Sequence, residues 1–254
     1  MSTAVRNSDL WFRNFAPAPS APVRLVCLPH AGGSASFYLP MARGLSPAVD
    51  VLCAQYPGRQ DRRQEPCRAT IGELADDLTE ALLPWCDRPL ALFGHSMGAT
   101  VGYEVARRLE VRSEPGAIRP LRLFASGRRA PSVPANDHIH ELEDAGILAE
   151  LTKLSGTMSQ ILGDEEIMRM ALPAIRADYT AAETYIDRAD APLRCPITVL
   201  TGDDDVRTTL EAARQWRRHT SGAFDFHVLR GGHFFIAEHM PAVLALIRDG
   251  LAEV

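Results

Sequence analysis

The chain has 254 residues, of which 46% are hydrophobic and 23% charged, a balance typical of ordinary globular proteins and not of disordered or collagen-like chains. The formal net charge of -5 argues against the clustered basic excess of a nucleic-acid-binding protein. No apolar run reaches the roughly 18 residues that a membrane-spanning helix needs, so we expect no membrane span.

We expect no secretory export signal in the first segment. Arg6, Asp9 and Arg13 are scattered through Met1 to Phe15, which lacks an apolar core of signal-peptide length. The five cysteines are widely spaced, with no C-x-x-C pair and no zinc-like spacing with histidine. We therefore expect a cytoplasmic protein with reduced thiols that needs neither a metal nor another cofactor.

Short apolar runs typical of β-strands recur along the chain. They are Val23 to Leu28, Val49 to Gln55, Leu90 to Phe93, Leu121 to Ala125, Ile197 to Leu200 and Phe226 to Leu229. Longer segments with helical spacing separate most of them, and one such helix follows a capping box at Thr70 to Glu73. This alternation predicts an α/β fold with a mostly parallel central sheet and helices on both faces.

The alternation breaks once, between the fourth and fifth of these runs. From about Asn136 to Tyr185 the chain shows only helical signals, including Leu148, Leu151 and Leu154 at three-residue steps. We expect a helical lid insertion at about residues 136–185, above the sheet. No internal repeat or heptad pattern occurs, and we expect one domain covering residues 1–254.

The strongest local motif is Gly94 to Gly98 (GHSMG), a G-x-S-x-G pattern between the apolar run that ends at Phe93 and a helix-like segment from Ala99 to Leu109. This context predicts a sharp strand-to-helix turn that exposes the Ser96 hydroxyl, with glycines that avoid Cβ clashes. The alternative is a glycine-rich turn without chemistry. We expect Ser96 to be a nucleophile.

A serine nucleophile needs a base and an orienting carboxylate, in the chain order Ser, Asp, His. His233 follows the last predicted strand and a glycine loop, which makes it the expected base; His239 is its closest rival. Asp205 follows the strand that ends at Leu200 with G-x-x-D spacing, and Asp203 is the next candidate. The remaining histidines and loop carboxylates are expected to be solvated or hydrogen-bonded groups.

Attack on a carbonyl produces an oxyanion, which requires preorganised donors. One backbone N–H is expected from Met97, the residue after the nucleophile. A second is expected from Ala31 in the loop after the first long strand. The alternative for Gly32 and Gly33, which follow Ala31, is that they only permit a turn.

Several segments spread over most of the chain resemble the type II thioesterases of polyketide and nonribosomal peptide assembly lines. They are Leu28 to Gly33 (LPHAGG), Tyr56 to Arg59 (YPGR) continuing through Arg62 to Glu65 and Pro66, Phe93 to Ala99 (FGHSMGA), Leu172 with Pro173, Arg176 to Tyr179 (RADY), Tyr185, Cys195 to Ile197 (CPI), Gly202 to Asp205 (GDDD), and Gly231 to Phe235 (GGHFF). The P-G-R-x-x-R-x-x-E-P string is much more specific than G-x-S-x-G.

The resemblance implies an α/β-hydrolase fold with a lid between its sixth and seventh strands. It also implies a serine thioesterase that clears stalled or wrong acyl groups from the phosphopantetheine arm of an acyl or peptidyl carrier protein. The family's nucleophile, acid and base correspond to Ser96, Asp205 and His233. One departure is Val206, where relatives often have proline, and this puts the local loop geometry in doubt.

Carrier proteins tend to be acidic, as this chain is, so docking is expected to use a local basic patch. Candidates are Arg128 and Arg129, with Arg59, Arg62 and Arg63 as others; a structural or solvated role is the alternative for each.

Three other functions remain open. A carboxylesterase or lipase-like enzyme would use the same triad on a small-molecule ester. A chain-terminating domain excised from a synthase is less favoured, because the chain begins at Met1 and contains no carrier-protein segment. A binding protein of the hydrolase fold that has lost catalysis is hard to reconcile with an intact triad.

Overall fold

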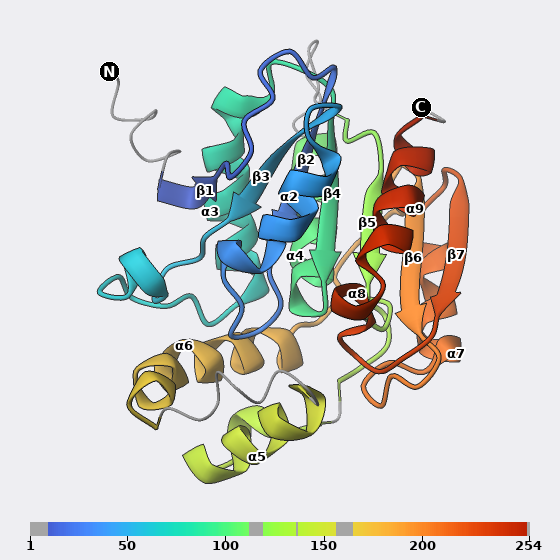
Figure 1. The fold of residues 1–254 in the computed structure, drawn as a ribbon. Coiled ribbons are helices and arrows are strands. Elements are labelled where there is room, and N and C mark those ends of the chain that lie inside the picture. Colours follow the sequence, from blue (N-terminus) through green and yellow to red (C-terminus); the bar gives the residue numbers. More distant parts are fainter. Residues whose placement is uncertain (1–9, 112–118, 136, 156–164, 253–254) are drawn as a thin grey trace.

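The computed structural model describes residues 10–111, 119–135, 137–155 and 165–252, and it contains one seven-stranded sheet (Figure 1). The strands are β1 (Phe12–Arg13), β2 (Val23–Leu28), β3 (Val49–Ala54), β4 (Leu90–His95), β5 (Leu123–Ser126), β6 (Ile197–Gly202) and β7 (Phe224–Leu229). Their order is β1-β3-β2-β4-β5-β6-β7, and every neighbouring pair is parallel except β1 with β3. The predicted α/β fold with a mostly parallel sheet is confirmed.

All six predicted strands occur; the strand Val23–Leu28 has the predicted bounds, and the other five have an end shifted by one or two residues. The additional edge strand β1 pairs Phe12 with Ala54 and Arg13 with Cys53. A two-residue strand is too short to show an alternating pattern, so β1 could not be predicted from the sequence. The strand predicted from Phe226 begins at Phe224, where Phe224 pairs with Ile197.

Helices cover both faces of the sheet and bury separate hydrophobic cores. One face carries α3 (Ile71–Leu82), α4 (Met97–Val111) and α7 (Leu210–Arg214), and the other carries α2 (Leu39–Leu45), α8 (Phe235–Glu238) and α9 (Met240–Ala252). Short 3-10 helices complete the fold: η1 (Ala35–Tyr38), η2 (Gln60–Arg62), η3 (Leu83–Trp85), η4 (Ile139–Glu141) and η6 (Gln215–His219).

The predicted capping signal marks the start of α3. Thr70 is its N-cap, and Thr70 Oγ1 accepts a hydrogen bond of 3.2 Å from the backbone N–H of Glu73. Leu74 and Leu78, one helical turn apart on α3, are buried in the core beneath this helix.

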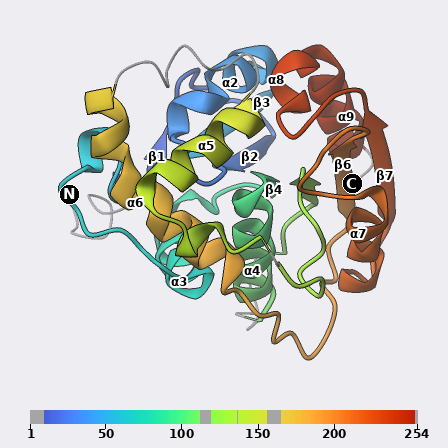
Figure 2. The ribbon, with the colours of Figure 1, turned by 90° about the horizontal axis from the view of Figure 1, so that it is seen from below.

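Two helices, α5 (Asp144–Ser155) and α6 (Glu165–Glu183), lie between β5 and β6, within the segment for which a lid is predicted, and are called the lid helices here. Seen from below, both helices lie across the end of the sheet toward which the parallel strands run (Figure 2). They share a small apolar core that includes Ile139, Ile147, Leu172 and Ile175. Within the described residues, no helix combines the length and hydrophobicity required to span a bilayer.

Candidate active site

Ser96 lies on the sharp turn between β4 and α4, the place that the G-x-S-x-G motif predicts. Its φ of 53° is in the left-handed region that residues with a Cβ rarely adopt. Close backbone packing explains the flanking glycines: a Cβ on Gly94 would lie 2.1 Å from the Gly98 carbonyl oxygen, and one on Gly98 would lie 2.0 Å from the Leu28 carbonyl oxygen. The strained turn therefore projects the Ser96 hydroxyl beyond the end of the sheet.

Three side chains from distant parts of the chain form a continuous hydrogen-bonded relay. His233 Nε2 lies 3.0 Å from Ser96 Oγ, within reach for proton transfer. His233 Nδ1 lies 2.9 Å and 3.1 Å from the two carboxylate oxygens of Asp205. The Asp205 side chain is fully buried, and its Oδ1 also accepts from the backbone N–H of Arg207 at 2.8 Å. The structure thus brings together the three residues that the sequence motifs predict.

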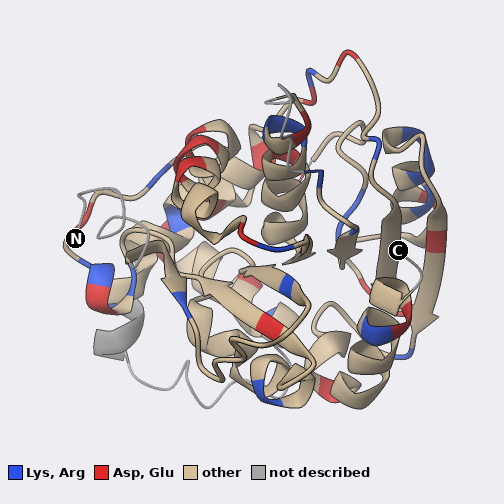
Figure 3. Ribbon diagram, turned by 90° about the horizontal axis from the view of Figure 1, so that it is seen from above, with Lys and Arg blue, Asp and Glu red and all other residues tan. Residues whose placement is uncertain are grey.

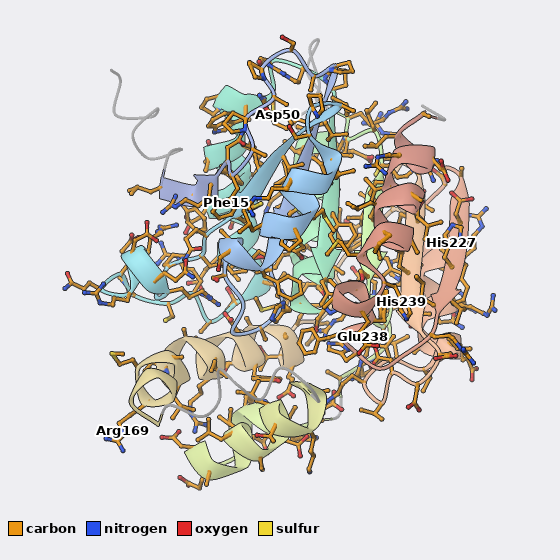
Figure 4. The ribbon with its side chains drawn as sticks, in the orientation of Figure 1. Phe15, Asp50, Arg169, His227, Glu238 and His239 are labelled. Carbon is orange, nitrogen blue, oxygen red and sulfur yellow. The ribbon has the colours of Figure 1, made fainter. Side chains whose placement is uncertain are left out.

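The alternatives considered from the sequence occupy other places. Asp203 Oδ1 accepts a hydrogen bond of 2.8 Å from the backbone N–H of Gly231 and so supports the loop that precedes His233. His239 caps the C-terminal end of α8 and lies beside that helix in Figure 4, while His227 lies on β7. Val206, the departure from the family pattern, is exposed and leaves Asp205 in contact with His233.

Two further histidines pack around the relay, and neither was predicted to have a role in it. The ring centroids of His95 and His233 lie 5.1 Å apart, and His30 packs edge-on against Phe234 at 5.0 Å. Burial, reinforced by repulsion from His233, lowers the pKa of His30 to about 3 and lowers that of His95 well below its usual value. Both rings therefore stay neutral near pH 7, and the imidazole within hydrogen-bond distance of Ser96 Oγ is that of His233.

The two predicted oxyanion donors lie beside the nucleophile. Ala31 and Met97 line the same cavity as Ser96 and His233. Met97 is the first residue of α4, so its backbone N–H lies at a helix N-terminus, where amide groups favour negative charge. Ala31 belongs to a tight turn in which the Gly33 N–H donates to the His30 carbonyl at 2.9 Å.

The arginines considered for docking are mostly engaged within the protein. Arg59 pairs with Asp178, and Arg62 pairs with Glu65 at 2.6 Å; both guanidinium groups are buried. Arg128 donates to the Ala182 carbonyl at 2.8 Å, and Arg129 pairs with Asp137. Arg63 alone of the five is exposed. Four of these five arginines therefore have contacts that indicate a structural role instead of a role in docking.

The described residues contain no cluster of three or more His, Cys, Asp or Glu side chains that could hold a metal ion. The relay instead has the elements of acyl transfer through a serine: a nucleophile, a base, an orienting carboxylate and backbone donors.

Comparisons with known proteins identify the family of the chain. The family described as thioesterase domain matches residues 23–251. The probable cadicidin biosynthesis thioesterase of Streptomyces griseus is 51% identical over 251 residues, covering 99% of this chain and 68% of the relative. Thioesterase PikA5 of Streptomyces venezuelae is 48% identical over 246 residues, covering 96% of this chain and 86% of the relative.

A solved structure extends the similarity to three dimensions. The type II thioesterase BorB from the borrelidin biosynthetic cluster superposes with a TM-score of 0.89 at 50% identity, covering 96% of this chain and 98% of BorB. The fold, the matched family and the sequence resemblance thus agree, and the chain belongs to the thioesterase family of α/β-hydrolases.

Proposed function

We propose that this thioesterase is a type II, editing enzyme that hydrolyses stalled or wrong acyl groups from the phosphopantetheine arm of a carrier protein in polyketide or nonribosomal peptide biosynthesis. The 3.0 Å contact between Ser96 Oγ and His233 Nε2, at the edge of a cavity under the lid, is the observation that carries the chemistry. The substrate class is supported by the similarity to BorB and to the cadicidin thioesterase.

In the acylation step, His233 Nε2 accepts the proton of Ser96 Oγ as this oxygen attacks the thioester carbonyl. The tetrahedral oxyanion then accepts hydrogen bonds from the backbone N–H groups of Met97 and Ala31. Asp205 holds His233 in the tautomer that carries hydrogen on Nδ1 and stabilises the imidazolium. When the C–S bond breaks, the pantetheine sulfur leaves and takes up the proton from His233.

Deacylation repeats the same cycle with water. His233 accepts a proton from water, and the oxygen attacks the acyl-Ser96 carbonyl. The Ser96–acyl bond then breaks, the serine oxygen recovers its proton from His233, and the free acid departs. A thiol with a pKa of about 8.5 leaves readily, so the first step requires less acid catalysis than cleavage of an alkyl ester.

The lid and the sheet are proposed to act as one catalytic domain across residues 1–254, because α6 contacts the loops around Ser96.

The carrier protein would deliver its arm near this lid. Docking near the lid is proposed to use local basic groups such as the exposed Arg63. At the other end of the sheet, seen from above in Figure 3, both signs of charge are mixed. All five cysteines are free, which supports a reducing compartment such as the cytoplasm.

A direct test loads a carrier protein with an acyl-phosphopantetheine group and follows its intact mass. The wild type is expected to return the carrier to its unacylated mass, while Ser96→Ala leaves the acyl group in place. Ser96→Ala removes only the nucleophilic oxygen and is the matched control. An acyl-carrier protein that stays loaded with the wild type, alongside rapid cleavage of a free oxygen ester, would favour the carboxylesterase function instead.

A further inference from the structure

The lid helix α6 makes two contacts with the loop that carries Ala31. Asp178 Oδ2 accepts a hydrogen bond of 2.7 Å from the backbone N–H of Gly32, the residue directly after Ala31. Ile175, almost one helical turn earlier, packs so close that a Cβ on Gly32 would lie 3.0 Å from its Cγ1. A single face of α6 therefore contacts the peptide unit next to the expected oxyanion donor.

The same carboxylate oxygen holds a buried arginine from the loop after β3. Arg59 donates to Asp178 Oδ2 and, through Nη1, to the Pro57 carbonyl at 2.7 Å. Only 2% of the Asp178 side chain and 6% of the Arg59 side chain are exposed. Burial raises the pKa of Asp178 against the opposing effects of Arg59 and the Gly32 N–H, so the contacts of this carboxylate offset a real desolvation cost.

A gain in stability alone does not explain why Arg59 and Asp178 form a buried ion pair. Replacing a buried ion pair by apolar residues is often neutral or stabilising, whereas breaking one partner leaves an uncompensated charge. Asp178 additionally accepts from a backbone group of a glycine loop, and Gly32 has a φ of +74°. Because glycine gives a loop conformational freedom, the orientation of this peptide depends on what binds it from outside.

From this geometry we infer that Asp178 is a positioning residue: together with Arg59 it fixes the Gly32 peptide so that the neighbouring Ala31 N–H points at the oxyanion that forms on Ser96. The lid helix α6 thereby supports the chemistry as well as covering the cavity. This inference rests on the proposed function. Farther along, the loop is also held by Gln55, whose Oε1 accepts from the Ala35 N–H at 2.9 Å and whose Nε2 donates to the Arg59 carbonyl at 3.3 Å.

The experiment separates positioning from stability with three variants. Asp178→Leu removes the acceptor and leaves Arg59 unpaired. The double variant Arg59→Met with Asp178→Leu removes both charges while keeping apolar volume, so it is expected to regain the melting temperature that Asp178→Leu loses. Asp178→Asn keeps one oxygen that can accept from both Gly32 and Arg59, and it tests rescue by the conservative change.

A matched control exists at the opposite end of the sheet. Asp50 also forms a buried pair with an arginine, Arg24, at 2.8 Å, and also accepts from a backbone N–H, that of Ala18 at 3.2 Å. Figure 4 labels Asp50 at the end of the sheet remote from the lid helices. Asp50→Leu is expected to lower the melting temperature and leave kcat within about twofold of the wild type, as expected for sites that share no partners.

Two readouts are measured: kcat and KM for an acyl-N-acetylcysteamine thioester, and the affinity for an alkylboronic acid, whose adduct with Ser96 is tetrahedral. Asp178→Leu and the double variant are expected to lower kcat about 100-fold with KM little changed, since removing an oxyanion donor costs about 10² to 10³. Boronate affinity should fall in parallel. Asp178→Asn should stay within about tenfold of the wild type, because a neutral acceptor retains the hydrogen bonds.

Recovery of kcat together with stability in the double variant would overturn the inference and assign the pair a purely structural role. A wild-type kcat in Asp178→Leu would do the same and leave the proposed function intact. A wild type without Ser96-dependent thioester hydrolysis would defeat the proposed function instead. Boronate affinity still tests the loop in that case, because adduct formation requires no turnover.

Discussion

Asp205→Asn replaces one carboxylate oxygen by an NH₂ group, and its effect can be derived from the contacts of the carboxylate. Oδ1 accepts from the backbone N–H of Arg207 at 2.8 Å, while Oδ2 is the oxygen nearer to His233 Nδ1, at 2.9 Å. In the asparagine, the amide oxygen must face the Arg207 N–H, because that donor cannot turn away. The amide nitrogen then faces His233 Nδ1 as a donor and forces hydrogen onto Nε2.

An imidazole with hydrogen on Nε2 cannot accept the Ser96 proton. The equivalent change in a well-studied serine protease lowers kcat about 10⁴-fold through the wrong tautomer, equivalent to about 5 kcal/mol in the barrier. We expect a similar loss here, with KM little changed, because Asp205 is buried behind His233 and does not reach substrate.

The assay follows free thiol release from an acyl-N-acetylcysteamine thioester under steady-state conditions. Asp203→Asn is the matched control, since Asp203 is exposed and bonds only to the loop at Gly231 among the described side-chain contacts. We expect this control to keep kcat within about tenfold, the range of a surface contact. The reasoning about the tautomer is refuted if Asp205→Asn keeps kcat within that same tenfold, or if both variants lose activity equally.

Three further changes test the turn, His30 and the helix cap. Gly98→Ala would place a Cβ 2.0 Å from the Leu28 carbonyl oxygen, so we expect loss of thiol release and of the cooperative melt by circular dichroism; an active, stable variant would contradict this packing. The fold lowers the pKa of His30 from 6.5 to about 3. Between these two values the unfolded chain binds the proton more readily than the folded chain, so the free energy of unfolding falls as the pH drops from 6.5 toward 3. His30→Phe should therefore reduce the pH dependence of the unfolding free energy in urea by about 1.4 kcal/mol per pH unit between pH 6 and pH 4; an unchanged slope would rule out a buried neutral histidine. Thr70→Ala removes the acceptor for Glu73 N–H and should cost about 1 kcal/mol of unfolding free energy without changing kcat; a kcat that changes instead would link α3 to the site.

The parts of the fold that were predictable depend on local patterns. The apolar run that ends at Phe93, the glycines around Ser96 and the following helix are adjacent in the sequence, so their joint geometry follows from short-range sterics. Asp205 could be favoured over Asp203 only by its spacing after the strand. Its burial and its contact with His233 depend on how two loops meet at the sheet edge.

The support of the oxyanion loop could not be predicted in the same way. Arg59 and Asp178 are separated by 119 positions, and neither lies in a pattern that specifies a partner. From residue type alone, Arg59 was a candidate for docking an acidic protein, because arginine is usually exposed. Its burial depends on how α6 packs across the end of the sheet, which is a property of the tertiary structure.

The most direct test of the central claim compares thiol release from an acyl-pantetheine thioester with cleavage of the matched oxygen ester, by the wild type and by Ser96→Ala. We predict that thioester cleavage is faster than oxygen-ester cleavage and disappears in Ser96→Ala. Faster cleavage of the oxygen ester would contradict the thioesterase assignment of the substrate, and hydrolysis that persists in Ser96→Ala would contradict the proposed role of the Ser96, His233 and Asp205 relay.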